Sequence, residues 1–290
     1  PRKSRVQEAL AAKTKQNDPH KVKEDELKFD AAMSASDRQR LQHADFQSLS
    51  ASEFNLVEKL ARQVRLPLPQ IQGRRTQSGV RGARIHWAKT LQEASRQDGD
   101  ILSLPRLQRK QQDLPLLILV DISGSMERYA RLLLAFLHQA TRGTPRQVFA
   151  FGTDLTDLNR AFKLRDTDDM LAAASAQIHD FAGGTQLGKS LTQFRTQHAR
   201  NLMGRRTVVL LISDGLDTGA KETLDSELAW LKRHTRSLLW LNPLLRFEGY
   251  APIATGASVL NRHVDGMLAI HNLSRLEELA SALSKLFKSQ

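Results

Sequence analysis

The chain of 290 residues contains no cysteine. It therefore has no disulfide, no zinc site built on thiolates and no cysteine nucleophile. Its nine histidines include neither an HExxH motif nor a pair spaced to bind metal from one helix face, so zinc hydrolysis has no support. Ser123 lacks the G-x-S-x-G surroundings of a hydrolase nucleophile. These absences leave no sign of a common hydrolytic site, and we expect a protein that is not an enzyme.

Long apolar segments are also absent. No run of eighteen apolar residues occurs, and the basic, polar start of the sequence lacks the apolar region of a signal peptide. We therefore expect no membrane span and a soluble, cytoplasmic protein. The length is sufficient for one large domain or two small ones with a substantial core.

The net charge of +12 is unevenly distributed. Residues 1–110 hold 22 Lys and Arg against 13 Asp and Glu, whereas residues 111–290 hold 21 against 18. The excess is concentrated between Lys59 and Lys110. A basic region can contact nucleic acid, an acidic protein surface or only solvent. Neither interleaved aromatic residues nor a recognised nucleic-acid motif is present, which favours an acidic protein surface over nucleic acid.

Three parts follow one another along the chain. Residues 1–70 have a helical pattern, with a capping box at Ser50 and Glu53 and a stop at Pro67 and Pro69. Residues 71–112 form a basic connector, which we expect to pack on or near the next domain and to hold a short helix near 85–94. Residues 113–290 alternate between apolar strand-like runs and amphipathic helices. This alternation predicts an α/β fold with a doubly wound, mostly parallel sheet and an N-terminal helical extension.

The expected elements of the third part can be given by residue. We predict strands at 116–120, 147–151, 207–213, 237–241 and 267–270, with a short strand or turn near 158–164. Helices are predicted at 130–140, 168–179, 187–198, 221–234 and 274–287. Leu224, Leu228 and Leu231 share one helical face and are assigned to the core.

Polar side chains follow the first of these strands. The segment LLILVDISGSM at 116–126 ends an apolar run with a carboxylate and two hydroxyls. In an open parallel sheet the carboxyl ends of the strands face the ligand crevice. A carboxylate and neutral hydroxyls are hard oxygen donors, which suit Mg²⁺ better than zinc or copper.

Two further segments complete this pattern. The strand TVVLLIS at 207–213 is followed by an aspartate, and Gly183-Gly184-Thr185 places a hydroxyl after a tight turn. Glycine permits a loop to approach a bound ion closely. Asp154 and Asp217 lie in neighbouring loops, where we expect them to cap backbone groups. The residues that form the pattern DxSxS…T…D are Asp121, Ser123, Ser125, Thr185 and Asp214.

This pattern resembles the metal-ion-dependent adhesion site of von Willebrand factor A (VWA) domains. The resemblance implies that Ser123 and Ser125 bind the metal directly, and that Thr185 does so directly or through water. It implies that Asp121 and Asp214 act through waters or hydrogen bonds. Such a site holds Mg²⁺, for which Mn²⁺ or Ca²⁺ can substitute. Neutral ligands leave the ion under-neutralised, so it attracts an Asp or Glu of a partner protein.

The resemblance extends beyond the site. GVRGARIHWAKTLQEASRQDGDIL before the motif, and SLLWLNPLLRFEGYAP with HVDGMLAIHNLSRLEELA after it, are similar to the CoxE-like family of bacterial VWA proteins. The similarity covers roughly residues 36–287. It implies an adaptor that works with a MoxR-type AAA+ ATPase to remodel, activate or mature a client metalloenzyme of the carbon monoxide dehydrogenase type.

One competing motif overlaps the site. GGTQLGKS at 183–190 satisfies the phosphate-loop pattern of nucleotide triphosphatases, which is an alternative function for the chain. A phosphate loop follows a buried strand directly, but the preceding AAASAQIHDFA is alanine-rich and helix-like. This context favours the metal site. A basic nucleic-acid-binding protein is the remaining alternative, and it predicts a steep salt dependence of binding.

Overall fold

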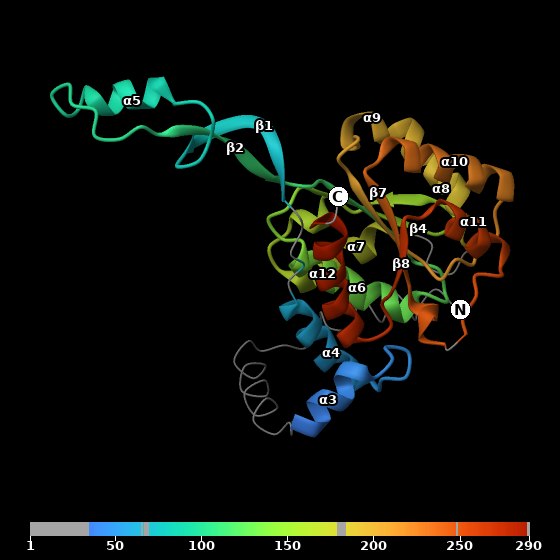
Figure 1. The fold of residues 1–290 in the computed structure, drawn as a ribbon. Coiled ribbons are helices and arrows are strands. Elements are labelled where there is room, and N and C mark those ends of the chain that lie inside the picture. The colour runs from blue at the N-terminus through green and yellow to red at the C-terminus, as the bar shows by residue number, and fades with distance from the viewer. Residues whose placement is uncertain (1–34, 65, 67–69, 179–183, 248, 289–290) are drawn as a thin grey trace. The chain divides into compact units, whose positions relative to one another are not determined.

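The computed structural model describes residues 35–288 apart from 65, 67–69, 179–183 and 248 (Figure 1). The predicted helices within 1–34, and Gly183 of the glycine turn, lie outside these described residues. The chain divides into two compact units. One unit comprises Pro1–Pro67 with Pro115–Gln290, and the other comprises Leu68–Leu114.

The first unit is built on a six-stranded sheet with the order β5-β4-β3-β6-β7-β8. Five strands are parallel, and the edge strand β5 is antiparallel to β4. The doubly wound, mostly parallel α/β fold predicted from the sequence is thereby confirmed. The strands are β3 (Leu116–Asp121), β4 (Arg146–Phe151), β5 (Leu155–Asp157), β6 (Val208–Ile212), β7 (Ser237–Asn242) and β8 (Gly266–Ala269).

The first strand of this sheet, β3, lies at its centre. It pairs with β4 on one side and with β6 on the other. The chain therefore winds outward from β3 to β4 and later returns to continue outward from β6. Ligand crevices in open α/β sheets form where the winding reverses, at the carboxyl ends of the strands. In this sheet the reversal lies between the ends of β3 and β6.

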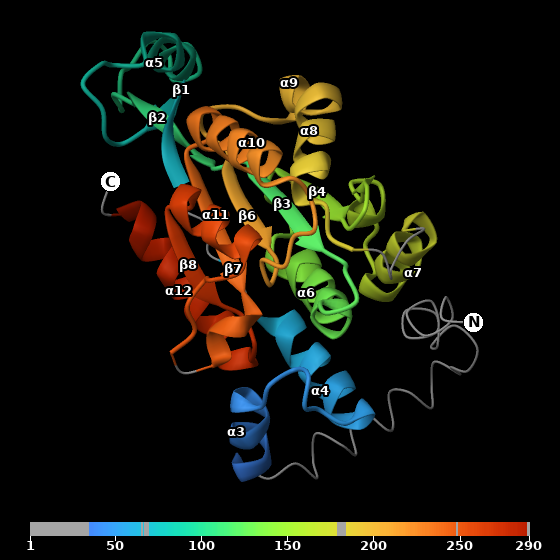
Figure 2. The same cartoon turned by 90° about the vertical axis from the view of Figure 1, so that its right-hand side faces the viewer.

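Helices cover both faces of the sheet (Figures 1 and 2). On one face Leu119 of β3 and Phe149 of β4 share a buried cluster with Leu191 and Leu228 from the covering helices. Since neighbouring residues of a strand point to opposite faces, Ile118 faces the other layer. The first face carries α8 (Leu187–Gln197), α10 (Lys221–His234) and α11 (Thr255–His263), and the second carries α6 (Glu127–Ala140), α7 (Thr167–Gln177) and α12 (Leu273–Lys288).

Most predicted elements agree with these bounds to within a few residues. Leu224, Leu228 and Leu231 are buried, as predicted. The region near 158–164, predicted as a short strand or turn, directly follows β5 and contains the 3₁₀ turn η1 (Ala161–Lys163). Three short elements were not predicted: α9 (Ala199–Leu202), η2 (Pro243–Arg246) and α11. The N-terminus of α11 has no side-chain cap, so its nine residues carry little sequence signal.

The N-terminal extension belongs to the same unit as the sheet. It contains α3 (Ala35–His43) and α4 (Ala51–Gln63), and α4 packs on α6. The predicted capping box is present, since the Ser50 hydroxyl accepts from the Glu53 amide and the Glu53 carboxylate accepts from the Ser50 amide. Glu58 of α4, only 2 % exposed, pairs with Arg131 of α6 at 3.3 Å.

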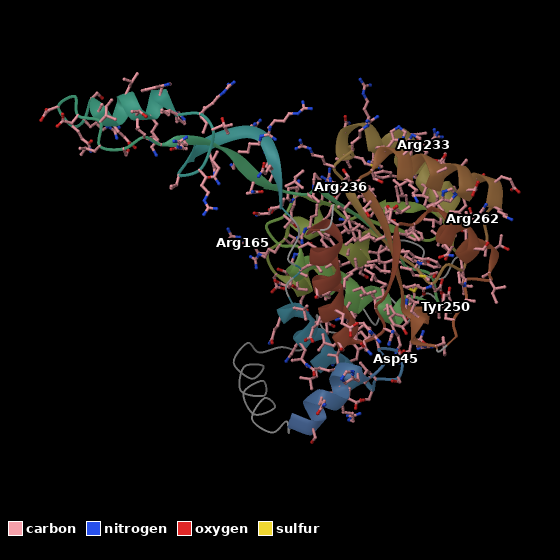
Figure 3. The ribbon with its side chains drawn as sticks, viewed as in Figure 1. Asp45, Arg165, Arg233, Arg236, Tyr250 and Arg262 are labelled. Atoms are coloured by element: carbon pink, nitrogen blue, oxygen red, sulfur yellow. The ribbon has the colours of Figure 1, made fainter. Side chains whose placement is uncertain are left out.

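A polar network joins the loop between α3 and α4 to the sheet unit. Asp45, labelled in Figure 3, accepts hydrogen bonds from Tyr129 at 2.9 Å and from Arg246 at 2.8 Å. Arg246 also bonds the side chain of Gln47 at 2.9 Å. Next to this network Phe46 is fully buried, with its ring 6.1 Å from that of Tyr129. The extension is therefore anchored by both apolar and charged contacts.

The second unit is a two-stranded antiparallel ribbon with a helix between its strands. It consists of β1 (Gln70–Gly79), α5 (Trp87–Ala94) and β2 (Arg106–Asp113), with a register shift between Gln72 and Thr76. The short helix within the predicted connector is confirmed by α5. The strands were not predicted, because QIQGRRTQSG and RLQRKQQD lack the alternating apolar pattern on which strand prediction depends.

None of the helices in the described part of the chain combines the length and the apolar character needed to cross a membrane.

The anchoring of the extension can be tested at Phe46. Replacing a fully buried phenylalanine by alanine removes its contacts and leaves a cavity. We expect Phe46→Ala to lower the free energy of unfolding of the whole unit by about 3–5 kcal/mol. Leu164→Ala, at a 41 % exposed side chain, is the control with little effect. If chemical denaturation instead showed an unchanged main transition, the extension would not be part of the cooperative unit.

Candidate metal centre

The central residue of the site is Asp121, the last residue of β3, whose side chain is fully buried. One carboxylate oxygen, Oδ1, accepts a hydrogen bond from the Ser123 amide at 2.9 Å. The other, Oδ2, accepts from the Ser213 hydroxyl at 2.8 Å. Oδ1 also lies 3.4 Å from the Thr185 hydroxyl. The carboxylate therefore contacts groups from the turn after β3 and from two other segments of the chain.

The two serines of the motif lie in the turn between β3 and α6. Their hydroxyl oxygens are 3.2 Å apart. Ser123 is buried, whereas Ser125 is exposed, so that the pair extends from the interior to the surface. The Met126 amide donates to the Ser123 carbonyl at 2.9 Å, which closes the turn before α6 begins at Glu127. The backbone thus presents both hydroxyls at the carboxyl end of the central strand.

Thr185 is 4 % exposed and is held by the loop that follows β6. The amide and hydroxyl of Thr218 both donate to the Thr185 carbonyl, at 2.8 and 2.9 Å. The preceding Gly184 lies close to the same residue, because a Cβ there would be 3.0 Å from the Thr218 hydroxyl oxygen. This close packing of the two loops places the Thr185 hydroxyl next to Asp121.

Asp214 follows β6 and is almost fully buried. Its carboxylate accepts a hydrogen bond from the Leu216 amide at 3.0 Å, and its charge raises the pKa of Asp121. Gly215, between Asp214 and Leu216, has a φ of +82°. A Cβ at this position would lie 2.8 Å from the Trp240 ring. Only glycine fits this position without strain.

Two supporting residues were not predicted from the sequence. The Ser213 hydroxyl donates to Asp121 and accepts from the Gly215 amide at 3.0 Å. Trp240 of β7 is fully buried, and its indole nitrogen donates to the Ser213 carbonyl at 2.8 Å. The available signal for Ser213 was its position as the first polar residue after an apolar strand. The sequence contains no signal for the role of Trp240, because this role depends on β6 and β7 being neighbours in the sheet.

The electrostatics of the site favour a bound cation. Burial raises the pKa of Asp121 to about 6, against hydrogen bonds from Ser123 and Ser213 that lower it, and the charge of Asp214 adds to the rise. Among the described residues, neither Asp121 nor Asp214 has an ion-pair partner. Two buried carboxylates beside three hydroxyls form an all-oxygen set that fits Mg²⁺.

The neighbouring aspartates have structural contacts. Asp217 accepts a hydrogen bond from the Leu187 amide at 2.8 Å and so caps the first turn of α8, as predicted. Asp154 pairs with Lys189 at 2.7 Å. Lys189 belongs to the phosphate-loop pattern, and its neighbour Gly188 packs against α10, where a Cβ would lie 2.9 Å from the Leu224 nitrogen. The nearest described element before this segment is the helix α7 rather than a strand.

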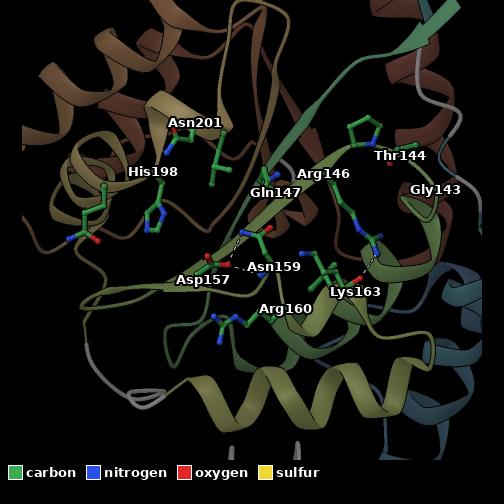
Figure 4. A pocket seen from close by; sticks show the side chains of 14 residues that line it. Gly143, Thr144, Arg146, Gln147, Asp157, Asn159, Arg160, Lys163, His198 and Asn201 are labelled. Carbon is green, nitrogen blue, oxygen red and sulfur yellow. Dashed lines mark hydrogen bonds between the residues drawn. The ribbon is translucent and has the colours of Figure 1, made fainter.

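A separate cavity of about 710 Å³ lies at the amino end of β4, where Arg146 begins the strand (Figure 4). The Arg146 guanidinium donates to the carbonyls of His138 and Phe162, at 2.7 and 2.8 Å. These bonds join the last turn of α6 to the segment after β5. The cavity includes none of the five motif residues, since they lie at the opposite ends of the strands.

Comparison with protein families identifies the fold that carries this site. The family profile described as VWA domain containing CoxE-like protein matches residues 57–276, which is most of the chain. The chain belongs to this CoxE-like family. The match includes all five motif residues and the ribbon unit. No curated protein matches the chain.

Solved structures resemble the CoxE-like chain at low sequence identity. Proximal thread matrix protein 1 from the mussel byssus is 16 % identical, with a TM-score of 0.43, over 61 % of this chain and 48 % of that one. A von Willebrand factor type A structure from Catenulispora acidiphila is 17 % identical, with a TM-score of 0.41, over 62 % of this chain and 44 % of that one. The CoxE-like chain thus spans about half the length of these proteins.

Removal of metal should affect stability. An ion that binds only the folded state raises the unfolding free energy by about 2.7 kcal/mol when its concentration is ~100 times Kd. We expect Mg²⁺ to raise the melting temperature of the wild type above its value in EDTA. The melting temperature of the double variant Ser123→Ala/Ser125→Ala should be the same in Mg²⁺ and in EDTA. Ser226→Ala, an exposed serine on α10, is the control that keeps the response. An equal Mg²⁺ response in the double variant would contradict the assignment.

The raised pKa of Asp121 predicts a pH dependence of stability. The folded-state value of about 6 exceeds the ordinary 3.8, so folding favours the protonated carboxyl. This contribution is complete below pH about 4 and is lost as the pH rises through about 6. In EDTA, the unfolding free energy of the wild type relative to Asp121→Asn should fall across this window, by at most about 3 kcal/mol. Chemical denaturation of both proteins at several pH values measures this difference in unfolding free energy. A difference that does not change with pH would refute the raised pKa of Asp121.

Proposed function

We propose that this CoxE-like chain is a Mg²⁺-dependent protein-binding adaptor and not an enzyme. The observation that carries the proposal is the buried Asp121 carboxylate, which lacks a cationic partner among the described residues and lies beside the Ser123 amide and the Thr185 hydroxyl. A buried charge of this kind is costly unless a cation compensates it. The location at the reversal of the sheet leaves the site open to a ligand from outside.

The motif residues would divide the work of holding the ion. Ser123, Ser125 and Thr185 would supply hydroxyl oxygens, and Asp121 and Asp214 would orient them and contribute negative charge. When bound, Mg²⁺ supplies a positive charge that neutral hydroxyls leave largely uncompensated, which attracts a carboxylate. Mn²⁺ or Ca²⁺ could replace it, and one of the mussel protein structures has zinc in the same type of motif. The ligand we propose is an Asp or Glu side chain of a partner protein.

The partners we propose follow from the family. Membership of the CoxE-like family suggests a MoxR-type AAA+ ATPase as the partner. It also suggests that the client to be remodelled or matured is a metalloenzyme of the carbon monoxide dehydrogenase type. The contacts of Gly188 and Lys189 give the phosphate-loop pattern a packing role, which supports binding over nucleotide hydrolysis. We further propose that the protein acts in the cytoplasm, where such a client would be assembled.

The test is a pull-down with the tagged full chain and a purified MoxR-type ATPase or client enzyme from the same cells. We expect retention of one of them in Mg²⁺, a loss of at least about tenfold in EDTA, and the same loss for Asp121→Ala. The matched control is Asp154→Ala, which removes an exposed carboxylate near the site without touching the motif. Equal retention with EDTA and with Asp121→Ala would rule out the metal site as the binding surface.

A further inference from the structure

Exposed apolar side chains are concentrated in the ribbon unit. The described residues include ten exposed large hydrophobic side chains, and six of these belong to the 47 residues of Leu68–Leu114. The buried hydrophobic residues of the unit's described part are only Ala94 and Leu114. Exposed large apolar side chains concentrated in one small unit point to an interaction surface. The six residues are Val80, Trp87, Leu91, Ile101, Leu102 and Leu104, here termed the apolar tip.

The helix α5 presents part of this tip as an ordered face. Trp87 and Leu91 are four residues apart and therefore lie one turn above the other, with 57 % and 61 % of their surface exposed. Thr90 and Ala94 form the buried face of the same helix. The tip thus orients its largest side chains outward while its small residues pack inward. Tryptophan is enriched among the residues that contribute most to binding at the centre of a protein interface.

The strands of the ribbon carry an excess of positive charge, which the apolar tip does not. The unit holds nine Lys and Arg against four Asp and Glu. Arg74 and Arg75 of β1 and Arg109 and Lys110 of β2 are all exposed. Within the described chain, no carboxylate pairs with any of these four. An acidic partner surface would therefore complement the strands.

The charges near the apolar tip distinguish a protein from a membrane. Between Val80 and Leu104 there are four Lys and Arg against three Asp and Glu, and two of the acidic residues, Asp98 and Asp100, lie within three positions before Ile101. An anionic lipid surface would repel these carboxylates at the depth where the apolar residues would have to enter. A protein can instead pair its own groups with them. The separation of a nearly neutral apolar tip from basic strands therefore favours a protein partner.

We propose that the ribbon unit is a second binding surface, which takes an acidic amphipathic helix of a partner protein. The apolar face of that helix would pack on Trp87 and Leu91, and its carboxylates would lie along Arg74 and Arg75. The partner's apolar residues would complete the core that the unit lacks. This surface shares no residue with the metal centre, so it goes beyond the proposed function and operates without Mg²⁺.

The probe is a labelled synthetic helix with leucine at positions i, i+3, i+4 and i+7 and glutamate elsewhere, titrated into the full chain in EDTA. We expect it to bind more tightly than a scrambled peptide of the same composition. Trp87→Ser/Leu91→Ser should weaken binding at least about tenfold. Arg74→Glu/Arg75→Glu should weaken it and reduce its salt dependence. Leu164→Ser, at an exposed leucine of the other unit, should leave it unchanged.

Three results would overturn the proposal. One is that neither peptide binds, or that both bind equally. Another is that the Trp87→Ser/Leu91→Ser variant binds as the wild type does. The third is that the chain binds phosphatidylglycerol vesicles through Trp87 and Leu91 while ignoring the peptide, which would make the tip a lipid-binding element. Because all titrations contain EDTA, failure of the metal-dependent adaptor function would not produce any of these results.

Discussion

A carboxylate buried at the end of the central strand is the constraint around which the sheet unit is arranged. Asp121 has no access to solvent, yet hydrogen bonds from Ser123 and Ser213 favour its charged form. The nearby Asp214 opposes that charge. A cation bound at the crevice would resolve this conflict between burial and hydrogen bonding. The hydroxyls of Ser125 and Thr185 lie next to Ser123 and Asp121, where such a cation would bind.

The sheet topology is what brings these groups together. Asp121 and Ser213 lie 92 positions apart in the sequence but at the ends of adjacent parallel strands. Since the winding reverses between β3 and β6, the helices that follow these strands cover opposite faces and leave the crevice between them open. The tight passage at Gly215 and the bond from Trp240 to Ser213 hold the second strand end in register with the first.

Much of this arrangement was predictable because its signals are local. Buried strands such as 116–120 are continuous apolar runs, and Leu224, Leu228 and Leu231 mark a helix face through their spacing. The five motif residues follow strands or a glycine turn, so their meeting at one edge follows from a parallel sheet. Ser213 and Trp240 could not be assigned, because their roles depend on which strands are neighbours. The ribbon strands were missed because they bury almost nothing, and strand prediction depends on burial.

The two units differ in how they use apolar residues. In the sheet unit these residues fill the layers between sheet and helices, and the N-terminal extension adds Phe46 and Glu58 to the packing around α6. In the described part of the ribbon unit, six large apolar side chains are exposed, and the strands carry basic side chains without a carboxylate partner among the described residues. An adaptor that joins two proteins requires two separate surfaces. A metal centre that takes one carboxylate and a ribbon that takes an acidic helix would supply them.

The most direct test of the metal centre is whether Mg²⁺ and a carboxylate bind together. Calorimetric titration of Mg²⁺ into the full chain can be carried out with a short glutamate-containing peptide, and again with its glutamine counterpart. We predict that the glutamate peptide tightens Mg²⁺ binding, because its carboxylate completes the charge around the ion, and that the glutamine peptide does not. Identical Mg²⁺ affinity with both peptides would contradict a site built to capture a partner's carboxylate.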